Sequence, residues 1–222
     1  SLTEVLEELN SIWEKTDPSI ILNLNFGSSG SLQQQIEQGA DVDVFLSAGS
    51  KQMNTLEAKG LLLKDTRVDL LSNRMALVIP KNSDNILSFE DLKKDDIRVI
   101  AVGEPTSVPA GEYAEEVLTN MELIEALKSK LTLGKDIRTV LSWVETKNAD
   151  AGMVFLTDAL ISEKVKVVET AQIESHQPIV YPAAVIKEAE NKEAAKLFME
   201  FLTDKNAGEV FEKYGFIFLP AK

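Results

Sequence analysis

The sequence predicts an α/β protein of two lobes, each built on a mixed, mostly parallel sheet flanked by helices. Helical and strand patterns alternate along residues 1–80, and a second alternating series occupies residues 95–168. Such alternation is typical of sheets whose parallel strands are joined by helices. No stretch rich in glycine, proline or serine separates the two series. We therefore expect lobes joined by crossing strands rather than two independent domains.

The first lobe is predicted to open with a helix. Apolar residues recur at helical spacing from Leu2 to Trp13. Ser1 and Glu4 have the spacing of a capping box, so this helix should start at the first residue. The next apolar stretch, SIILNLNF at residues 19–26, is typical of a strand.

The alternation continues through the rest of this lobe. The helix SLQQQIEQ should end at Gly39 and the helix after SAGS at Gly60, because glycine is favoured just after a helix. The strand VDVFLS at residues 42–47 lies between these helices, and NRMALVIPK at residues 73–81 predicts a further strand.

The second lobe shows the same pattern with clearer helix starts. SFEDLKK predicts a short helix capped by Ser88, and the strand IRVIAVGEP follows at residues 97–105. Pro109 marks the first turn of a long helix, which LIEALKSKL is expected to continue. Asp136 is the expected N-cap of the next helix, and AGMVF at residues 151–155 is the next strand.

The last third of the chain completes the second lobe and then returns to the first. KVKVVET predicts a strand, and residues 178–187 predict another that carries a proline and should lie at an edge or bend. NKEAAKLFMEFLT and DKNAGEVFEKYG predict two closing helices. We expect residues 1–83 and 179–222 to form the first lobe and residues 84–178 the second, with a ligand cleft between them.

Composition excludes several classes of function. The formal net charge of −13 argues against nucleic-acid binding, which needs clustered Lys and Arg. The chain has no cysteine, which excludes disulfides, a thiolate nucleophile and Cys metal sites. No apolar run approaches the length of about 20 residues that spans a membrane.

Catalytic motifs are absent. The sequence contains no P-loop, no G-x-G-x-x-G after a strand, no H-E-x-x-H and no G-x-S-x-G. Its one histidine, His176, lies in the polar stretch ESHQP, where a solvated loop residue is the simplest interpretation. We therefore expect a binding protein that is not an enzyme and that needs no cofactor.

Several predicted helix starts follow strands and carry small residues. They include Ser29, Ala48 and Asp136–Ile137, with Ser1 at the first helix. Helix N-termini offer unpaired N–H groups and a positive dipole end, so they can bind an anion without a cation. Ordinary capping explains any one of these turns equally well, so the anion hypothesis depends on their number.

Seven segments, in order over essentially the whole chain, match one family: SLTEVL, FGSSGSLQQQIEQGADVDVFLSAG, NRMALVIPK, AVGEPTSVPAGEYAEEVL, DIRTVLSWVE, AGMVFLTDA and YGF. In these segments the chain resembles the molybdate-binding proteins of bacterial and archaeal ABC importers. The resemblance implies a two-lobed fold of the type II periplasmic-binding-protein class, which closes on molybdate or tungstate and docks on a membrane permease. It also implies a periplasmic or extracellular location, with a lipid anchor through a preceding segment as one form.

The same resemblance assigns the oxyanion ligands by position. Ser1 and Ser29 correspond to ligand serines, while Ala48 and Ile137 correspond to residues that donate backbone N–H groups. None of them contacts the metal atom itself. Many family members complete the shell with a tyrosine where this chain has Phe155, which cannot donate a hydrogen bond. We keep Phe155 as a wall residue, although core packing explains it as well.

Two further expectations follow. Family members place a strand before the position of Ser1, so we expect a longer natural chain. The protein should act as a monomer.

The alternative functions are those of a binding protein for another small oxyanion such as sulfate, or of the ligand-sensing domain of a regulator. A small carboxylate is a further competitor, and its binder would normally have an arginine in the cleft. Arg138 adjoins Ile137, but its helical neighbours favour a structural role.

Overall fold

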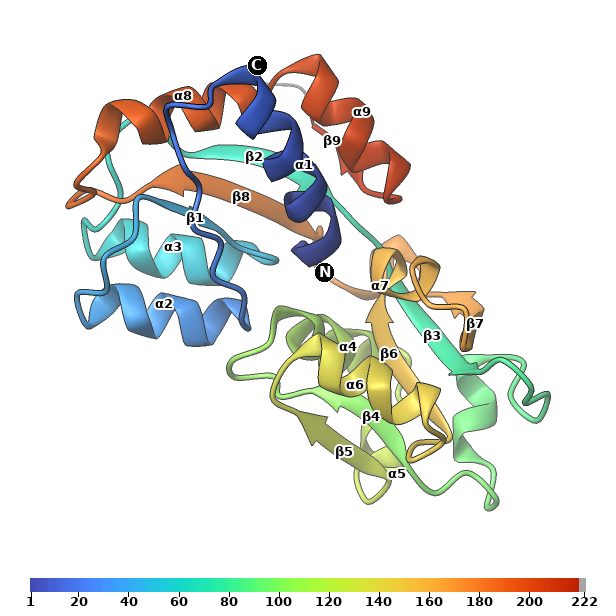
Figure 1. Ribbon diagram of the computed structural model, residues 1–222. Helices are drawn as coiled ribbons and strands as arrows, with labels where there is room; N and C mark the ends of the chain where they lie inside the picture. Colours follow the sequence, from blue (N-terminus) through green and yellow to red (C-terminus); the bar gives the residue numbers. More distant parts are fainter. Residues whose placement is uncertain (220–222) are drawn as a thin grey trace. The chain divides into compact units, whose positions relative to one another are not determined.

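The structure is a computed structural model that describes residues 1–219. It divides the chain into two compact units (Figure 1). Unit 1 comprises Ser1–Ser72 and the chain from Val180 onward, and unit 2 comprises Asn73–Ile179. The first boundary therefore falls earlier than the expected one after residue 83, because the strand at residues 75–80 pairs within the sheet of unit 2.

Unit 1 contains a four-stranded sheet in the order β1-β8-β2-β9. Every described pairing in it is antiparallel. The expectation of a mostly parallel sheet is therefore wrong for this unit. The reason is β8, which returns from late in the chain and inserts between two early strands, running opposite to both. The strands are β1 (Val44–Leu46), β2 (Val68–Ser72), β8 (Val180–Val185) and β9 (Ile217–Phe218).

The proline of β8 was expected at an edge or a bend, and β8 lies in the interior of the sheet with an irregular pairing beside its proline. Pro182 lies opposite Asp69, and the pairing shifts register between Asp69 and Leu71. The irregularity lies where proline has no N–H to donate to the ladder. The Pro182 carbonyl still accepts a 3.0 Å hydrogen bond from the Ser47 N–H.

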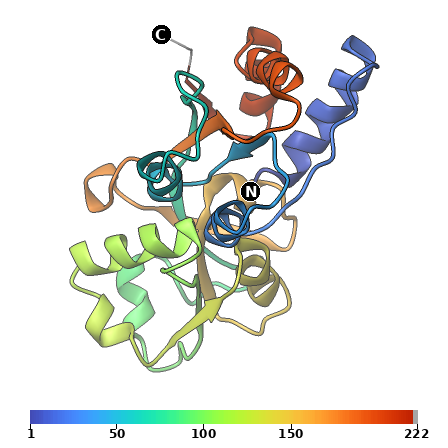
Figure 2. The ribbon, with the colours of Figure 1, turned by 90° about the vertical axis from the view of Figure 1, so that its left-hand side faces the viewer.

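The strand expected at residues 19–26 is not formed. Residues 21–28 run as an irregular segment between the first two helices, visible in both views (Figures 1 and 2). Its apolar residues have the right pattern, but no described strand pairs with it. Ile21 consequently remains 81% exposed. A strand pattern without a hydrogen-bonding neighbour does not make a strand.

Among the described residues, unit 1 has five helices. The first begins at Thr3 with Leu2 at the N-cap, two residues later than the predicted start at Ser1. Trp13 anchors its far end, since the indole ring packs edge-on against Phe198 and Phe201. The helices are α1 (Thr3–Thr16), α2 (Ser29–Glu37), α3 (Ser50–Ala58), α8 (Lys192–Leu202) and α9 (Lys205–Lys213).

Helices α2 and α3 share one apolar cluster with β1 and β8. This shared core fixes the two helices on the sheet. Both helices end at the expected glycines, with Gly39 and Gly60 at positive φ. The buried cluster consists of Ile36, Phe45, Met53, Leu56, Ala184 and Ile186.

Unit 2 contains a five-stranded mixed sheet in the order β5-β4-β6-β3-β7. The pairs β4–β5 and β4–β6 are parallel, while β3 runs antiparallel to both β6 and β7. The mixed sheet predicted for this lobe is confirmed. The strands are β3 (Met75–Pro80), β4 (Ile100–Gly103), β5 (Leu131–Gly134), β6 (Ala151–Phe155) and β7 (Val165–Thr170).

The helices of unit 2 are shorter than expected around residue 122. Glu122 has a φ of 58°, which ends the long helix and leaves a single short turn before β5. Pro109 occupies the first turn of α4, as predicted. The helical segments are η1 (Phe89–Lys93), α4 (Pro109–Asn120), α5 (Ile124–Leu127), α6 (Ile137–Glu145), α7 (Leu156–Leu160) and η2 (Ile173–Ser175). Throughout residues 1–219, no helix has the length and apolar character needed to cross a membrane.

Candidate functional site

The two serines at the start of α2 have different roles. Ser28 is the N-cap, and its Oγ accepts a 3.4 Å hydrogen bond from the Ser31 N–H. Ser29 is the first residue of the helix, and its side chain is not used for capping. Only 5% of Ser29 is exposed. Capping therefore explains Ser28 and leaves the buried hydroxyl of Ser29 to be explained otherwise.

The Ser29 hydroxyl is hydrogen-bonded to another predicted ligand residue of unit 1, Ala48. The Ala48 N–H donates a 2.9 Å hydrogen bond to Ser29 Oγ. That bond occupies a lone pair of the hydroxyl, so its proton remains to be donated. Within residues 1–219, no group accepts that proton. A buried donor without an acceptor is uncommon in folded proteins, and an oxyanion would supply the acceptor.

Ala48 lies in a tight turn between β1 and α3. Ser47 precedes it with 0% exposure, and Gly49 follows it as the N-cap residue of α3. The Ser47 Oγ donates to the Gly49 carbonyl at 2.7 Å and accepts from the Gly49 N–H at 3.4 Å. The residues on both sides of Ala48 are therefore held by the same hydroxyl.

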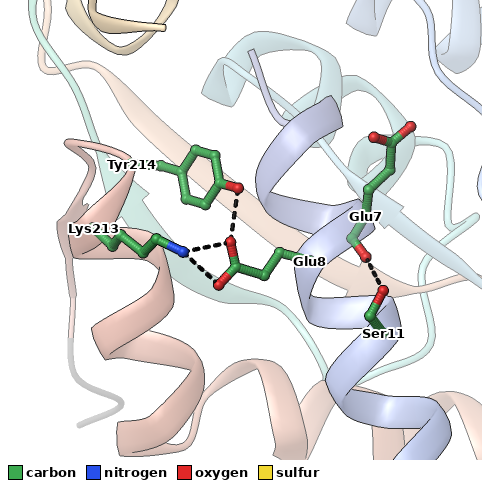
Figure 3. Close-up of polar contacts among 5 residues, drawn as sticks. All are labelled: Glu7, Glu8, Ser11, Lys213 and Tyr214. Atoms are coloured by element: carbon green, nitrogen blue, oxygen red, sulfur yellow. Dashed lines mark hydrogen bonds and ion pairs between the residues drawn. The ribbon is translucent and has the colours of Figure 1, made fainter.

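Ser1 lies in unit 1, two residues before α1 begins, and it is half-buried. Helix α1 is joined to the end of α9 through Glu8, which lies about one turn after α1 begins (Figure 3). Lys213 Nζ contacts the two carboxylate oxygens of Glu8 at 2.7 and 2.8 Å, and the Tyr214 hydroxyl donates to Glu8 Oε2 at 2.7 Å. This cluster ties the helix that follows Ser1 to the C-terminal helix of the unit.

The Glu8 cluster changes the acidity of its members. The hydrogen bond from Lys213, and then that from Tyr214, lowers the pKa of Glu8 below its ordinary value. The hydrogen bond to the Glu8 carboxylate raises the pKa of Tyr214 to about 12. The folded state therefore favours a charged carboxylate beside a neutral phenol.

In unit 2, the start of α6 matches the prediction. Asp136 is the N-cap, and its carboxylate accepts from the Thr139 N–H at 2.7 Å and from Thr139 Oγ1 at 2.8 Å. Ile137 is the first residue of the helix, and its side chain is buried. The N–H groups of a first helical turn have no acceptor within the helix. The backbone N–H of Ile137 is therefore suited to donate a hydrogen bond to an anion.

Phe155 ends β6 and precedes α7, with 1% of its surface exposed. Its ring lies 6.1 Å from that of Tyr113, in an edge-on arrangement. The Tyr113 hydroxyl donates a 3.5 Å hydrogen bond to the Pro178 carbonyl. Sequence reasoning did not single out Tyr113, because no local pattern indicates that α4 and β6 bring these rings together.

The predicted residues thus fall into two groups. In unit 1, a hydrogen bond joins Ser29 to Ala48 directly. In unit 2, Ile137 follows β5 and Phe155 ends β6. Because both strands run parallel to β4, their carboxyl ends lie at the same edge of the sheet. That edge is where ligands bind in open α/β sheets.

Comparison with known proteins agrees with this architecture. The family model for bacterial extracellular solute-binding proteins matches residues 1–217. The chain is 45% identical over 217 residues to the Bacillus subtilis protein named "Putative ABC transporter substrate-binding lipoprotein YvgL", covering 97% of this chain and 83% of that protein. It is 36% identical over 220 residues to the molybdate-binding protein ModA of Haemophilus influenzae, with coverages of 97% and 86%.

A solved structure shows the same fold. The periplasmic molybdate-binding protein of Azotobacter vinelandii superposes with a TM-score of 0.89 at 24% identity, and the match covers 99% of this chain and 96% of that one. The predicted type II periplasmic-binding-protein class is therefore confirmed. This chain belongs to the family of bacterial extracellular solute-binding proteins, whose members bind solutes and are not enzymes.

Proposed function

We propose that this chain captures molybdate or tungstate outside the cytoplasm and delivers it, as a monomer, to the membrane permease of an ABC importer. The names of its relatives support this proposal, since ModA of Haemophilus influenzae, at 36% identity, is a molybdate-binding protein. The name of YvgL, at 45% identity, assigns that protein to an ABC transporter. The chemistry of the predicted ligand residues gives independent support.

The observation that carries the proposal is the buried pair Ser29 and Ala48. Ser29 lies at the first position of a helix, its hydroxyl receives the Ala48 N–H, and its own proton has no acceptor within residues 1–219. A tetrahedral oxyanion offers four acceptor oxygens and no donor, which complements such a group. The positive end of the α2 dipole adds a favourable field for a negative ligand.

The proposed ligand shell consists of neutral donors. Ser1, Ser29 and Ala48 belong to unit 1, and the N–H of Ile137 belongs to unit 2. Phe155 contributes an apolar wall. Hydroxyl and backbone N–H groups at helix starts bind anions without a cation, as the family resemblance requires. The metal atom of the oxyanion contacts no protein atom in this shell, so the ligand is an anion rather than a coordinated metal ion.

A donor-only shell also predicts selectivity. Protonated phosphate carries an O–H that needs an acceptor, so binding it would leave a polar group unpaired. Sulfate is smaller than molybdate and would stretch hydrogen bonds from donors that the fold holds in place. Molybdate and tungstate have nearly the same size, so we expect little discrimination between them.

Thermal unfolding with each of four anions tests the proposal. A ligand at 100 times its dissociation constant adds about 2.7 kcal/mol to the free energy of unfolding. For a chain of this size that corresponds to a rise in the midpoint of roughly 5–10 °C. We expect this rise with molybdate and tungstate, and little change with sulfate or phosphate. A rise with sulfate alone would favour a sulfate-binding protein, and no rise with any of the four would refute oxyanion capture.

A further inference from the structure

We propose that Ser47, a residue with no assigned role, is a positioning residue of the anion site. Its hydroxyl holds the turn that directs the Ala48 N–H toward Ser29. The inference deepens the proposed function and rests on it. Ser47 itself does not contact the ligand in this proposal; it acts through the peptide group that follows it.

The contacts of Ser47 are those of a fixed group. Its N–H donates to the Pro182 carbonyl of β8 at 3.0 Å, so the backbone is anchored to an interior strand of the sheet. Its Oγ donates to the Gly49 carbonyl at 2.7 Å and accepts from the Gly49 N–H at 3.4 Å. The side chain is fully buried. A hydrogen bond between buried groups is strengthened by the low local dielectric constant, so the 2.7 Å bond to the Gly49 carbonyl is costly to lose.

These bonds act on the residue between them. Ala48 is bounded by Ser47, which is fastened to the sheet, and by Gly49, which is fastened to the Ser47 hydroxyl. The orientation of the Ala48 peptide group is therefore determined by the turn and not by the alanine side chain. Its N–H donates to Ser29 Oγ at 2.9 Å. The hydroxyl of Ser47 thus orients the Ala48 N–H, and the bond from that N–H orients the Ser29 hydroxyl.

The residue type matters because the Ser47 hydroxyl is both a donor and an acceptor. Alanine can be neither, and its substitution would leave the buried Gly49 carbonyl without this partner. Cysteine has a similar size but donates weakly. The simpler role for Ser47 is to stabilise the start of α3 without affecting the site. The two roles differ in what happens to the Ala48 amide.

Amide hydrogen exchange in the ligand-free protein separates these roles. We compare wild type with Ser47→Ala and with Ser175→Ala as a matched control. Ser175 is also buried, and its hydroxyl donates a 2.6 Å bond to the Gln172 carbonyl in unit 2. We expect Ala48 to exchange about tenfold faster in Ser47→Ala, the effect of losing about 1.4 kcal/mol of protection. Ser175→Ala should leave the Ala48 rate unchanged.

Binding provides the second measurement. By calorimetry, the molybdate dissociation constant should rise about tenfold in Ser47→Ala and stay the same in Ser175→Ala, even if both variants lose similar stability. Should Ser47→Ala fail to fold, Ser47→Cys replaces it, with a smaller change in the same direction. An Ala48 exchange rate or a dissociation constant equal to that of wild type would overturn the inference.

The design also distinguishes this inference from the proposed function. If wild type binds none of the four anions, the proposed function fails and the site role of Ser47 fails with it. If wild type binds molybdate and Ser47→Ala binds it equally well, only the positioning role is overturned. The exchange measurement needs no ligand, so it reports on the Ser47–Ala48 relationship in either case.

Discussion

The backbone N–H of Ala48 donates a 2.9 Å hydrogen bond to the Oγ of Ser29, which lies 19 positions earlier in the chain. This bond joins the residue before the N-cap of α3 to the first residue of α2. It brings together, within one unit, two donors that the sequence places in separate turns. Their arrangement is built by packing α2 and α3 on the same apolar cluster.

Replacing Ser29 should weaken anion binding while leaving the fold intact. Ser29→Ala removes one hydrogen bond to a charged ligand, worth about 1.5–3 kcal/mol, so the molybdate dissociation constant should rise roughly ten- to a hundredfold. Ser28→Ala is the matched control. It removes the helix cap, which should lower the free energy of unfolding by about 1 kcal/mol without changing affinity. Calorimetric titration of both variants provides the measurement, and equal losses of affinity would contradict the division of roles.

Restoring a hydroxyl at Phe155 should strengthen binding. Phe155→Tyr adds a donor where many family members have one, and we expect the molybdate dissociation constant to fall about tenfold. The ligand-free protein should lose about 1 kcal/mol, because the new hydroxyl is buried. Tyr113→Phe, altered at the neighbouring ring, serves as the control with unchanged affinity. An unchanged dissociation constant in Phe155→Tyr would mean that the residue lies outside the shell.

The contribution of the Glu8 cluster to the free energy of unfolding should decrease at acidic pH. Because the folded state lowers the pKa of Glu8, its contribution is present above the ordinary carboxyl pKa and is lost as the pH falls through the lowered value. Glu8→Gln should therefore lose about 1 kcal/mol at pH 7, where the carboxylate is charged. It should match wild type in strong acid. Glu7→Gln, one residue earlier, is the control. Thermal midpoints of the three proteins, measured from pH 7 down to strong acid, provide the test.

The same cluster predicts an alkaline effect of opposite sign. The pKa of Tyr214 is raised to about 12 in the folded state from an ordinary value of 10.0. Between these values the unfolded chain loses the phenolic proton while the folded chain retains it, so stability falls as the pH rises. Tyr214→Phe should lose this dependence. Denaturant unfolding of wild type and Tyr214→Phe at pH 9 and at higher pH measures this dependence. If the free energy of unfolding falls equally in the two proteins, the raised pKa of Tyr214 is contradicted.

A close backbone approach in unit 2 should tolerate no side chain. A Cβ at Gly111 would lie 2.2 Å from the carbonyl oxygen of Gly103, which is backbone and cannot move aside. Gly111→Ala should therefore cost about 3 kcal/mol by separating α4 from β4. Gly27→Ala is the control, because its Cβ would meet only the Leu32 side chain at 3.4 Å. A midpoint for Gly111→Ala close to that of wild type would show that α4 shifts without penalty.

The sequence by itself determined those features that depend on neighbours along the chain. The Asp136 cap, the first-turn Pro109 and the helix ends at Gly39 and Gly60 are all present. Each depends on the conformational preference or hydrogen bonding of residues within one or two turns. The family resemblance also named candidate ligands, two of which the structure brings into contact.

The tertiary structure decided everything that depends on distant partners. The segment at residues 19–26 has the pattern of a strand but no ladder, while β2, β5 and β9 form strands that sequence reasoning missed. A strand exists only where another chain segment pairs with it, and β8 makes the sheet of unit 1 antiparallel from more than a hundred residues away. Local periodicity carries no information about that choice.

The same division holds at the candidate site. The sequence shows serines in GSSGS and SAGS but does not reveal which of them caps a helix, which faces a partner and which holds a turn. Those roles fall to Ser28, Ser29 and Ser47 only when α2, β1 and α3 are packed together. The physical reason is that a hydroxyl takes its function from the donors and acceptors that the fold places around it.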